Sequence, residues 1–143
     1  MEVPLKIRAL KEFFGDAALN EFQYSEALIK KAAIVADIIN TMPVTYGQDG
    51  LGDEAIAYLH YQIRIPSHPD SDWYITEKDI SGQGQVQAFG LACLGNCSTP
   101  ELGYISLEEL LSIPVVSLDL NFIPTSIGDI KEQIKKAGNN EQY

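Results

Sequence analysis

The residues best suited to chemistry gather in one stretch, CLGNCSTPELGYISLEELLS, at positions 93–112. It holds both cysteines of the chain, Cys93 and Cys97, together with several carboxylates. A zinc site needs about four ligands at characteristic spacings, and no second Cys/His pair lies nearby in the sequence. Cys93 with His60 would be the pair for thiol catalysis, but no motif around Cys93 indicates an activated thiolate. We therefore expect two free thiols, no metal and no cofactor.

Carboxylates offer a second kind of chemistry, the binding of a hard divalent cation. The candidates are Glu77, Asp79, Glu101 and Asp119, which lie at or near the ends of predicted strands. The alternative is that they are ordinary acids at strand ends, because nothing in the sequence brings them together. No residue stands out as catalytic.

A third candidate is a polar strand face formed by His60, Gln62 and Arg64. In AIAYLHYQIRI, residues 55–65, these side chains alternate with apolar ones and so share one side of a strand. The histidine has the properties of a general base or an anion holder. The alternative is a histidine that faces solvent or is hydrogen-bonded for structural reasons.

Charge gives the clearest signal about partners. The chain carries a net charge of −10, and the stretch 32–130 contains thirteen acids but only Arg64 and Lys78 as cations, a balance of −11. Such a body repels phosphate, so direct binding to nucleic acid is not expected, and a protein partner would be basic. The proposed acidic binding face is Glu77, Asp79, Glu101, Glu108 and Asp119. The alternative is simply a well-solvated surface.

The length and the N-terminus indicate one domain in the cytoplasm. A chain of 143 residues suits a single compact domain. The N-terminal MEVPLKIRALKEFF has scattered charges and no apolar core, so it predicts neither a signal peptide nor a membrane span.

The patterning predicts an α+β fold. Residues 1–40 carry helical periodicity, and strands are predicted at 55–65, 73–77, 86–92, 101–105 and 115–123. Ser106 followed by Glu109 is a capping box, which makes Ser106 a helix cap and not a nucleophile. A C-terminal helix is predicted over 126–138. We expect an antiparallel meander of four or five strands (55–122), packed by the N-terminal helices and the C-terminal helix.

Five segments in order carry a family resemblance: MPVTYGQDG, WYITEKD, AFGLA, PELGYISLEEL and LDLNF. Over about residues 42–122 the chain resembles the bacterial domain-of-unknown-function family 2958, which is found in plasmids, integrated elements and phages. The most specific segment is PELGYISLEEL. The chain departs from the family pattern at Leu118, where an arginine is expected before Asp119. The resemblance implies a mobile-element setting, but no activity, catalytic residue or cofactor.

These observations together favour a non-catalytic accessory or interaction protein of a mobile genetic element, which binds a basic protein partner. The alternative is a small enzyme or metal-binding domain that uses the carboxylate cluster. The two differ in whether the acids form an exposed face or converge on one point.

Overall fold

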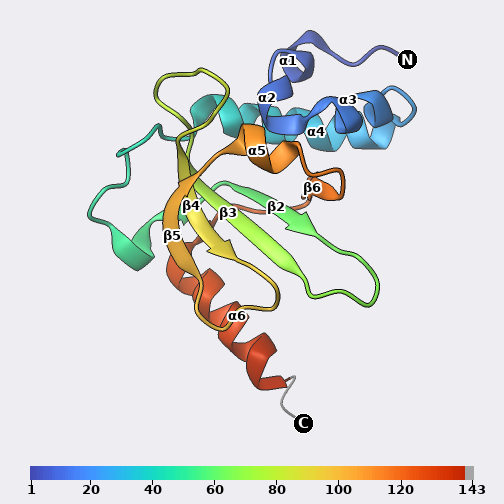
Figure 1. Cartoon of the computed structure of the whole chain (residues 1–143). Helices are drawn as coiled ribbons and strands as arrows, with labels where there is room; N and C mark the ends of the chain where they lie inside the picture. The colour runs from blue at the N-terminus through green and yellow to red at the C-terminus, as the bar shows by residue number, and fades with distance from the viewer. Residues whose placement is uncertain (141–143) are drawn as a thin grey trace.

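The N-terminal part of the chain is helical, as predicted. The computed structural model describes residues 1–140 and begins with helices α1 (Leu5–Arg8), α2 (Lys11–Phe14), α3 (Asp16–Phe22) and α4 (Glu26–Thr41). The chain turns sharply between α2 and α3 at Gly15, whose φ of 83° is readily adopted by glycine. These four helices lie together at one end of the molecule (Figure 1).

Helix α4 is the longest of this group, and its ends follow from local chemistry. The side chain of Ser25 accepts a hydrogen bond from the Leu28 backbone N–H at 3.2 Å and so caps the helix start. Pro43 follows the helix end closely and cannot continue it. One stripe of α4 is buried against the sheet and the other helices: Ala32, Val35, Ala36 and Ile39.

The centre of the fold is a five-stranded antiparallel sheet in the order β5-β4-β3-β2-β6. Its strands are β2 (Leu59–Ile63), β3 (Ser71–Glu77), β4 (Ala88–Cys93), β5 (Glu101–Ile105) and β6 (Val116–Leu118). The first four form a meander, which confirms the predicted α+β class. The fifth does not extend the meander beyond β5, because helix α5 (Leu107–Leu111) leads the chain back to the other edge, beside β2.

The first predicted strand, at 55–65, is divided. Strand β1 (Ile56–Ala57) leaves the main sheet and pairs with β7 (Thr125–Ser126) in a separate two-stranded sheet. The loop before it, which includes the short 3-10 helix η1 (Gly52–Glu54), is fastened to β1 by the side chain of Gln48. That amide accepts from the Ile56 N–H at 2.6 Å and donates to the Ile56 carbonyl at 2.8 Å.

Helix α6 (Ile127–Asn140) closes the chain and covers the face of the sheet opposite the N-terminal helices (Figure 1). Ser126 accepts from the Asp129 N–H at 3.2 Å, so the predicted cap is present, while the helix continues two residues beyond the predicted end at Gly138. Because neighbouring strand residues point to opposite faces, the helices pack in two separate cores. Leu59, Tyr61 and Ile75 belong to the first core with the N-terminal helices, and Ala57, Leu91, Ile127 and Ile130 belong to the second with α6.

The two cysteines are joined, so the prediction of free thiols is wrong. Cys93 ends β4 and forms a disulfide with Cys97, with 5.3 Å between their Cα atoms. Gly95 and Asn96, at φ 61° and 55°, fold the intervening residues into a tight turn. That turn returns Cys97 to Cys93, an effect of local backbone geometry that cysteine spacing and expected compartment did not reveal.

The cap of helix α5 provides a test of the local sequence reasoning. The Ser106 side chain accepts from the Glu109 N–H at 3.2 Å, which is the serine half of the predicted capping box; the return bond from the Ser106 N–H to the Glu109 side chain is not formed within the described residues. We expect Ser106→Ala to lower the free energy of unfolding by about 1 kcal/mol in urea titrations, because one helix N–H loses its acceptor. Ser98→Ala, at an exposed loop position, is the control and should have no measurable effect. Equal stability of the two variants would contradict the capping role.

Candidate functional site

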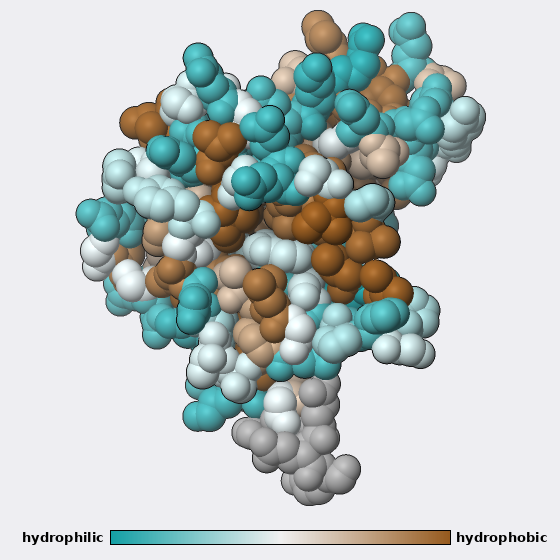
Figure 2. Space-filling view, in the orientation of Figure 1, coloured by the Kyte–Doolittle hydropathy of each residue, from teal (hydrophilic) through white to brown (hydrophobic). Residues whose placement is uncertain are grey.

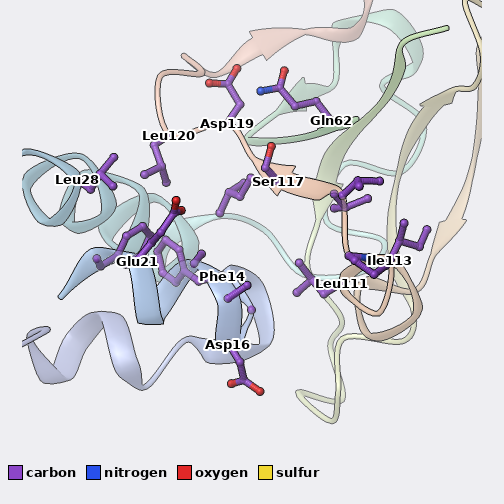
Figure 3. A pocket seen from close by; sticks show the side chains of 18 of the residues that line it. Phe14, Asp16, Glu21, Leu28, Gln62, Leu111, Ile113, Ser117, Asp119 and Leu120 are labelled. Carbon is purple, nitrogen blue, oxygen red and sulfur yellow. The ribbon is translucent and has the colours of Figure 1, made fainter. Parts of the chain in front are cut away.

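A groove of about 680 Å³ lies between the N-terminal helices and the segment around β6. Its walls combine polar and apolar groups, and the apolar ones include Phe14, Phe22 and Leu28 from the helices, and Leu111 and Leu118 from α5 and β6. Figure 3 shows Asp16 and Glu21 on the helical side of this groove and Gln62, Ser117 and Asp119 on the strand side. Of the residues that line the groove within the described part of the chain, Lys31 is the one cation.

The groove exists because the helices cover only part of the sheet next to its edge. Gly15 brings the turn between α2 and α3 close to Leu111, and a Cβ at this glycine would lie 3.3 Å from a Leu111 methyl. Beyond this contact Ile113 and Val115 keep 38% and 49% of their surfaces exposed. Figure 2 shows hydrophobic surface gathered around the position that β6 and the nearby end of β2 occupy in Figure 1.

The backbone of β6 adds polar groups to this apolar setting. The Asp119 N–H donates to the His60 carbonyl at 2.8 Å. This bond determines which residues of β6 direct their backbone N–H and C=O toward β2 and which direct them away from it. Leu118 lies next to Asp119 and opposite Tyr61, so its N–H and C=O point away from β2. Within residues 1–140 no strand pairs with the outer side of β6, and these groups therefore face the groove edge.

Behind the groove, Asp119 is held by His60. One Asp119 carboxylate oxygen lies 2.9 Å from Nδ1 of His60, and Asp72 lies 2.6 Å from Nε2. Asp72 also accepts from Arg64 at 2.6 Å. Each ring nitrogen of His60 thus has a carboxylate oxygen as its partner. The result is a chain of hydrogen bonds from Arg64 through Asp72 and His60 to Asp119 at the rim of the groove.

Aromatic rings pack against the imidazole ring of His60. The ring of Tyr74 stacks on His60 with centroids 4.5 Å apart and planes 4° apart, and Phe122 packs against both rings. Burial, reinforced by the nearby Asp72 charge, raises the pKa of Tyr74 to about 12. For Asp72, burial acts to raise the pKa, but hydrogen bonds and charge from His60 and Arg64 outweigh it and hold the pKa below its ordinary value.

The predicted polar strand face is present but divided between two environments. His60 is only 6% exposed, so of the two alternatives to a functional role, the hydrogen-bonded histidine describes it and the solvent-facing one does not. Gln62 lines the groove. Arg64 is exposed and contacts Asp72 and, at 3.6 Å, Asp70. His60 is thus a positioning residue for Asp119 and has no access to a ligand.

The five acids proposed as one binding face do not form one. Glu77 and Asp79 are 4% and 3% exposed and therefore do not belong to a surface. Asp79 accepts from Ser81 at 2.9 Å and from the Gln87 N–H at 3.1 Å, and so it orders the loop before β4. The other three acids, Glu101, Glu108 and Asp119, lie apart from one another.

Of those three, Glu101 begins β5 and Asp119 follows β6, which are opposite edges of the sheet. Glu108 is exposed on α5, beside Gly84. The carboxylate cluster suggested for a cation is likewise not assembled, because its members lie at both edges of the sheet, at the end of the central strand β3 and in the loop after β3. Among the residues that the structure describes, no group of three or more His, Cys, Asp and Glu side chains is placed to hold a metal ion.

Three acidic residues at the site were missed by the sequence reasoning. Asp72 was counted only as part of the net charge, although the hairpin register pairs it with Gln62 and pairs Tyr74 with His60. Aligning the two predicted strands as an antiparallel hairpin would have found both neighbours. Asp16 and Glu21 reach the groove only through the packing of α3, for which the sequence has no comparable signal.

Comparison with models of protein families, with curated protein sequences and with solved structures gave no match. The resemblance to family 2958 therefore stays a prediction. None of the described helices has the length and apolar character needed to cross a membrane.

The charged chain behind the groove predicts a specific dependence on pH. A carboxylate with a lowered pKa stabilises the fold above its unfolded-state pKa, about 4, and loses this contribution as the pH falls through the folded-state value. We expect Asp72→Asn to lower the free energy of unfolding by about 2 kcal/mol near neutral pH. In urea titrations the difference in free energy of unfolding between this variant and the unmodified protein should shrink as the pH is lowered below about 4.

Asp70→Asn is the matched control for this experiment. Asp70 pairs with Arg64 at the surface, and its loss should cost less than about 1 kcal/mol at any pH. If the difference in free energy of unfolding between Asp72→Asn and the unmodified protein stayed constant from neutral to acid pH, the role of the Asp72 charge beside Arg64 and His60 would be contradicted.

Proposed function

We propose that the protein is a non-catalytic interaction protein that binds an extended segment of a basic partner protein along strand β6. The observation that carries this proposal is the combination of an unpaired strand edge with an apolar groove beside it. An exposed edge is a template for another strand, and most proteins block theirs unless the edge is used.

Strand addition accounts for the two kinds of surface found together here. The backbone groups of Leu118 that point outward can bond to the partner's main chain, which supplies affinity for any extended peptide. Alternate side chains of that peptide would then enter the groove between β6 and the helices. The exposed Ile113 and Val115 lie beside this path and offer apolar contacts for a hydrophobic residue of the partner.

Charge favours a basic segment. Among the described residues that line the groove, Asp16 and Glu21 lie on its helical side and Lys31 is the one cation, while the Asp119 carboxylate at its rim is bonded to His60. The wider body of the protein is also negative, with a balance of −11 over residues 32–130. This field would speed encounter with a basic partner more than it would increase the final affinity, and it opposes direct binding of nucleic acid.

The setting of this interaction is part of the proposal. The resemblance to family 2958 supports an accessory role on a plasmid, integrated element or phage, and such a role favours the cytoplasm. That compartment reduces most disulfides, and a bridge such as Cys93–Cys97, which closes a loop of only a few residues, contributes at most about 2 kcal/mol. The fold would therefore persist with the two thiols reduced.

Affinity purification from the native host is the first step of the test, since it needs no assumption about the partner. The captured protein is then identified, and its binding segment is made as a peptide. Hydrogen exchange should show the Leu118 amide becoming protected when the peptide binds, because strand addition gives that N–H a new acceptor. Binding without added protection anywhere along β6 would reject strand addition.

A charge reversal tests the role of the groove. Glu21→Lys should slow association with the peptide by about threefold at low salt, and the effect should fade as ionic strength rises. Glu101→Lys is the matched control, because Glu101 is an exposed acid at the opposite edge of the sheet. Equal slowing by both variants would indicate general attraction to the negative body and not docking at β6.

A further inference from the structure

A second cavity of about 210 Å³ lies at the other side of the sheet, away from β6. It is bounded by the loop that follows α4, by the end of β3 and by β4 and β5. Several segments that carry the family resemblance meet here, namely MPVTYGQDG, WYITEKD, AFGLA and PELGYISLEEL. The proposed strand addition at β6 leaves this cavity unused.

The cavity contains a carboxylate that is almost fully buried. Glu77 is 4% exposed, and one of its oxygens accepts from the Thr76 hydroxyl. The other oxygen has no hydrogen-bond partner among residues 1–140. Every completely buried side-chain polar atom in the described part has a hydrogen-bond partner. This oxygen has none, so it is not completely buried and is open to the cavity that Glu77 lines. A carboxylate withdrawn from water in this way attracts a donor or a positive charge.

Aromatic side chains also line this cavity, namely Tyr46, Phe89 and Tyr104. The hydroxyl groups of Tyr46 and Tyr104 are hydrogen-bonded at 2.9 Å, and Tyr104 packs edge-on against Phe89 with ring centroids 5.7 Å apart. Tyr104 is 56% exposed, so part of its ring is free. The negative faces of such rings attract organic cations.

The charged side chains that line the cavity, among the described residues, are all acidic. Asp49 is a second acid on its lining, and none of the described residues that line it is Lys or Arg. The positive partner of Glu77 is therefore not supplied by the cavity's own walls. A bound cation from outside would provide it.

The loop that forms one wall is held in a defined conformation. Tyr46 has a φ of 72°, an uncommon value for a bulky residue that persists only where the surroundings impose it. The Gln48 side chain donates to the carbonyls of Ile56 and Thr76 at 2.8 and 2.9 Å and ties the loop to both β1 and β3. This rigid support keeps Tyr46 beside Tyr104 and lowers the entropic cost of binding.

We propose that this cavity binds a small organic cation, a guanidinium or ammonium group, with Glu77 as its counter-ion and Tyr46, Tyr104 and Phe89 around its apolar part. The volume is below that of pockets for drug-sized ligands, so the ligand is about the size of one basic side chain. Two sources provide this chemistry, a free metabolite-sized amine or guanidine and an arginine or lysine side chain of a protein. The cavity is separate from β6, and its test is independent of the proposed strand addition.

Titration calorimetry and NMR chemical-shift mapping with defined probes test the proposal. The probes are agmatine as a free cation, N-acetyl-arginine amide as a model of a side chain, and N-acetyl-citrulline amide as the uncharged analogue. At least one cation should bind and shift the signals of Tyr46 and Tyr104, while the citrulline compound should bind at least tenfold more weakly. The stronger of the two cations identifies the source.

Two variants and a control assign the effect to this cavity. Glu77→Gln keeps the shape and the contact with Thr76 but removes the charge, and it should weaken binding of the cation at least tenfold. Tyr104→Leu changes an exposed position and should leave the fold intact, and it should weaken binding severalfold through the lost ring face. Glu101→Gln, an exposed acid on the same strand as Tyr104, is the control and should bind as the unmodified protein does.

Three results would overturn the proposal. The first is no binding of either cation at millimolar concentration, and the second is equal binding of the arginine and citrulline compounds. The third is an equal effect of the Tyr104→Leu and Glu101→Gln variants, which would show attraction to the negative surface in general. Because Tyr104 is exposed, this comparison remains decisive even where Glu77→Gln alters the fold, which thermal unfolding detects.

Discussion

The alternation of side chains along β2 is the constraint on which the two halves of the structure depend. Tyr61 points to one face, where its hydroxyl donates to the Phe13 carbonyl and links the sheet to the N-terminal helices. Burial raises the pKa of this tyrosine, which stays a neutral donor. Its neighbour His60 points to the opposite face and joins Asp72 to Asp119. A one-residue slip would place a charged network in the main core and a tyrosine among carboxylates.

The sequence predicts local structure well where one interaction decides it. The strand periods, the Ser25 and Ser106 caps and the start of the C-terminal helix depend on residues within a few positions of each other. The position of β6 depends instead on which edge of the sheet has room after α5 turns the chain. The helices and β2 together decide that, and no short sequence pattern contains it. For the same reason the groove was not predictable, although two of its residues, Gln62 and Asp119, were already candidates.

The acids show why charge composition does not predict a binding face. Glu77 and Asp79 are close in sequence to exposed residues, but both are buried for different reasons. A register shift between Ile75 and Glu77 changes the alternation at the end of β3 and pairs Glu77 with Phe89. Asp79 instead accepts several hydrogen bonds from the loop that follows it. The first effect depends on the pairing between β3 and β4 and the second on the conformation of the loop after β3, and net charge contains neither.

The two edges of the sheet are not equivalent, and this difference explains why a partner strand would choose β6. Strand β5 is also an edge, but it begins with the charged Glu101 and borders a cavity of about 210 Å³, against about 680 Å³ beside β6. A peptide on β5 would also gain backbone bonds, but the smaller cavity there would receive fewer of its side chains. A peptide on β6 would gain backbone bonds and more burial, because exposed apolar side chains lie at the same edge where the Leu118 backbone groups point outward.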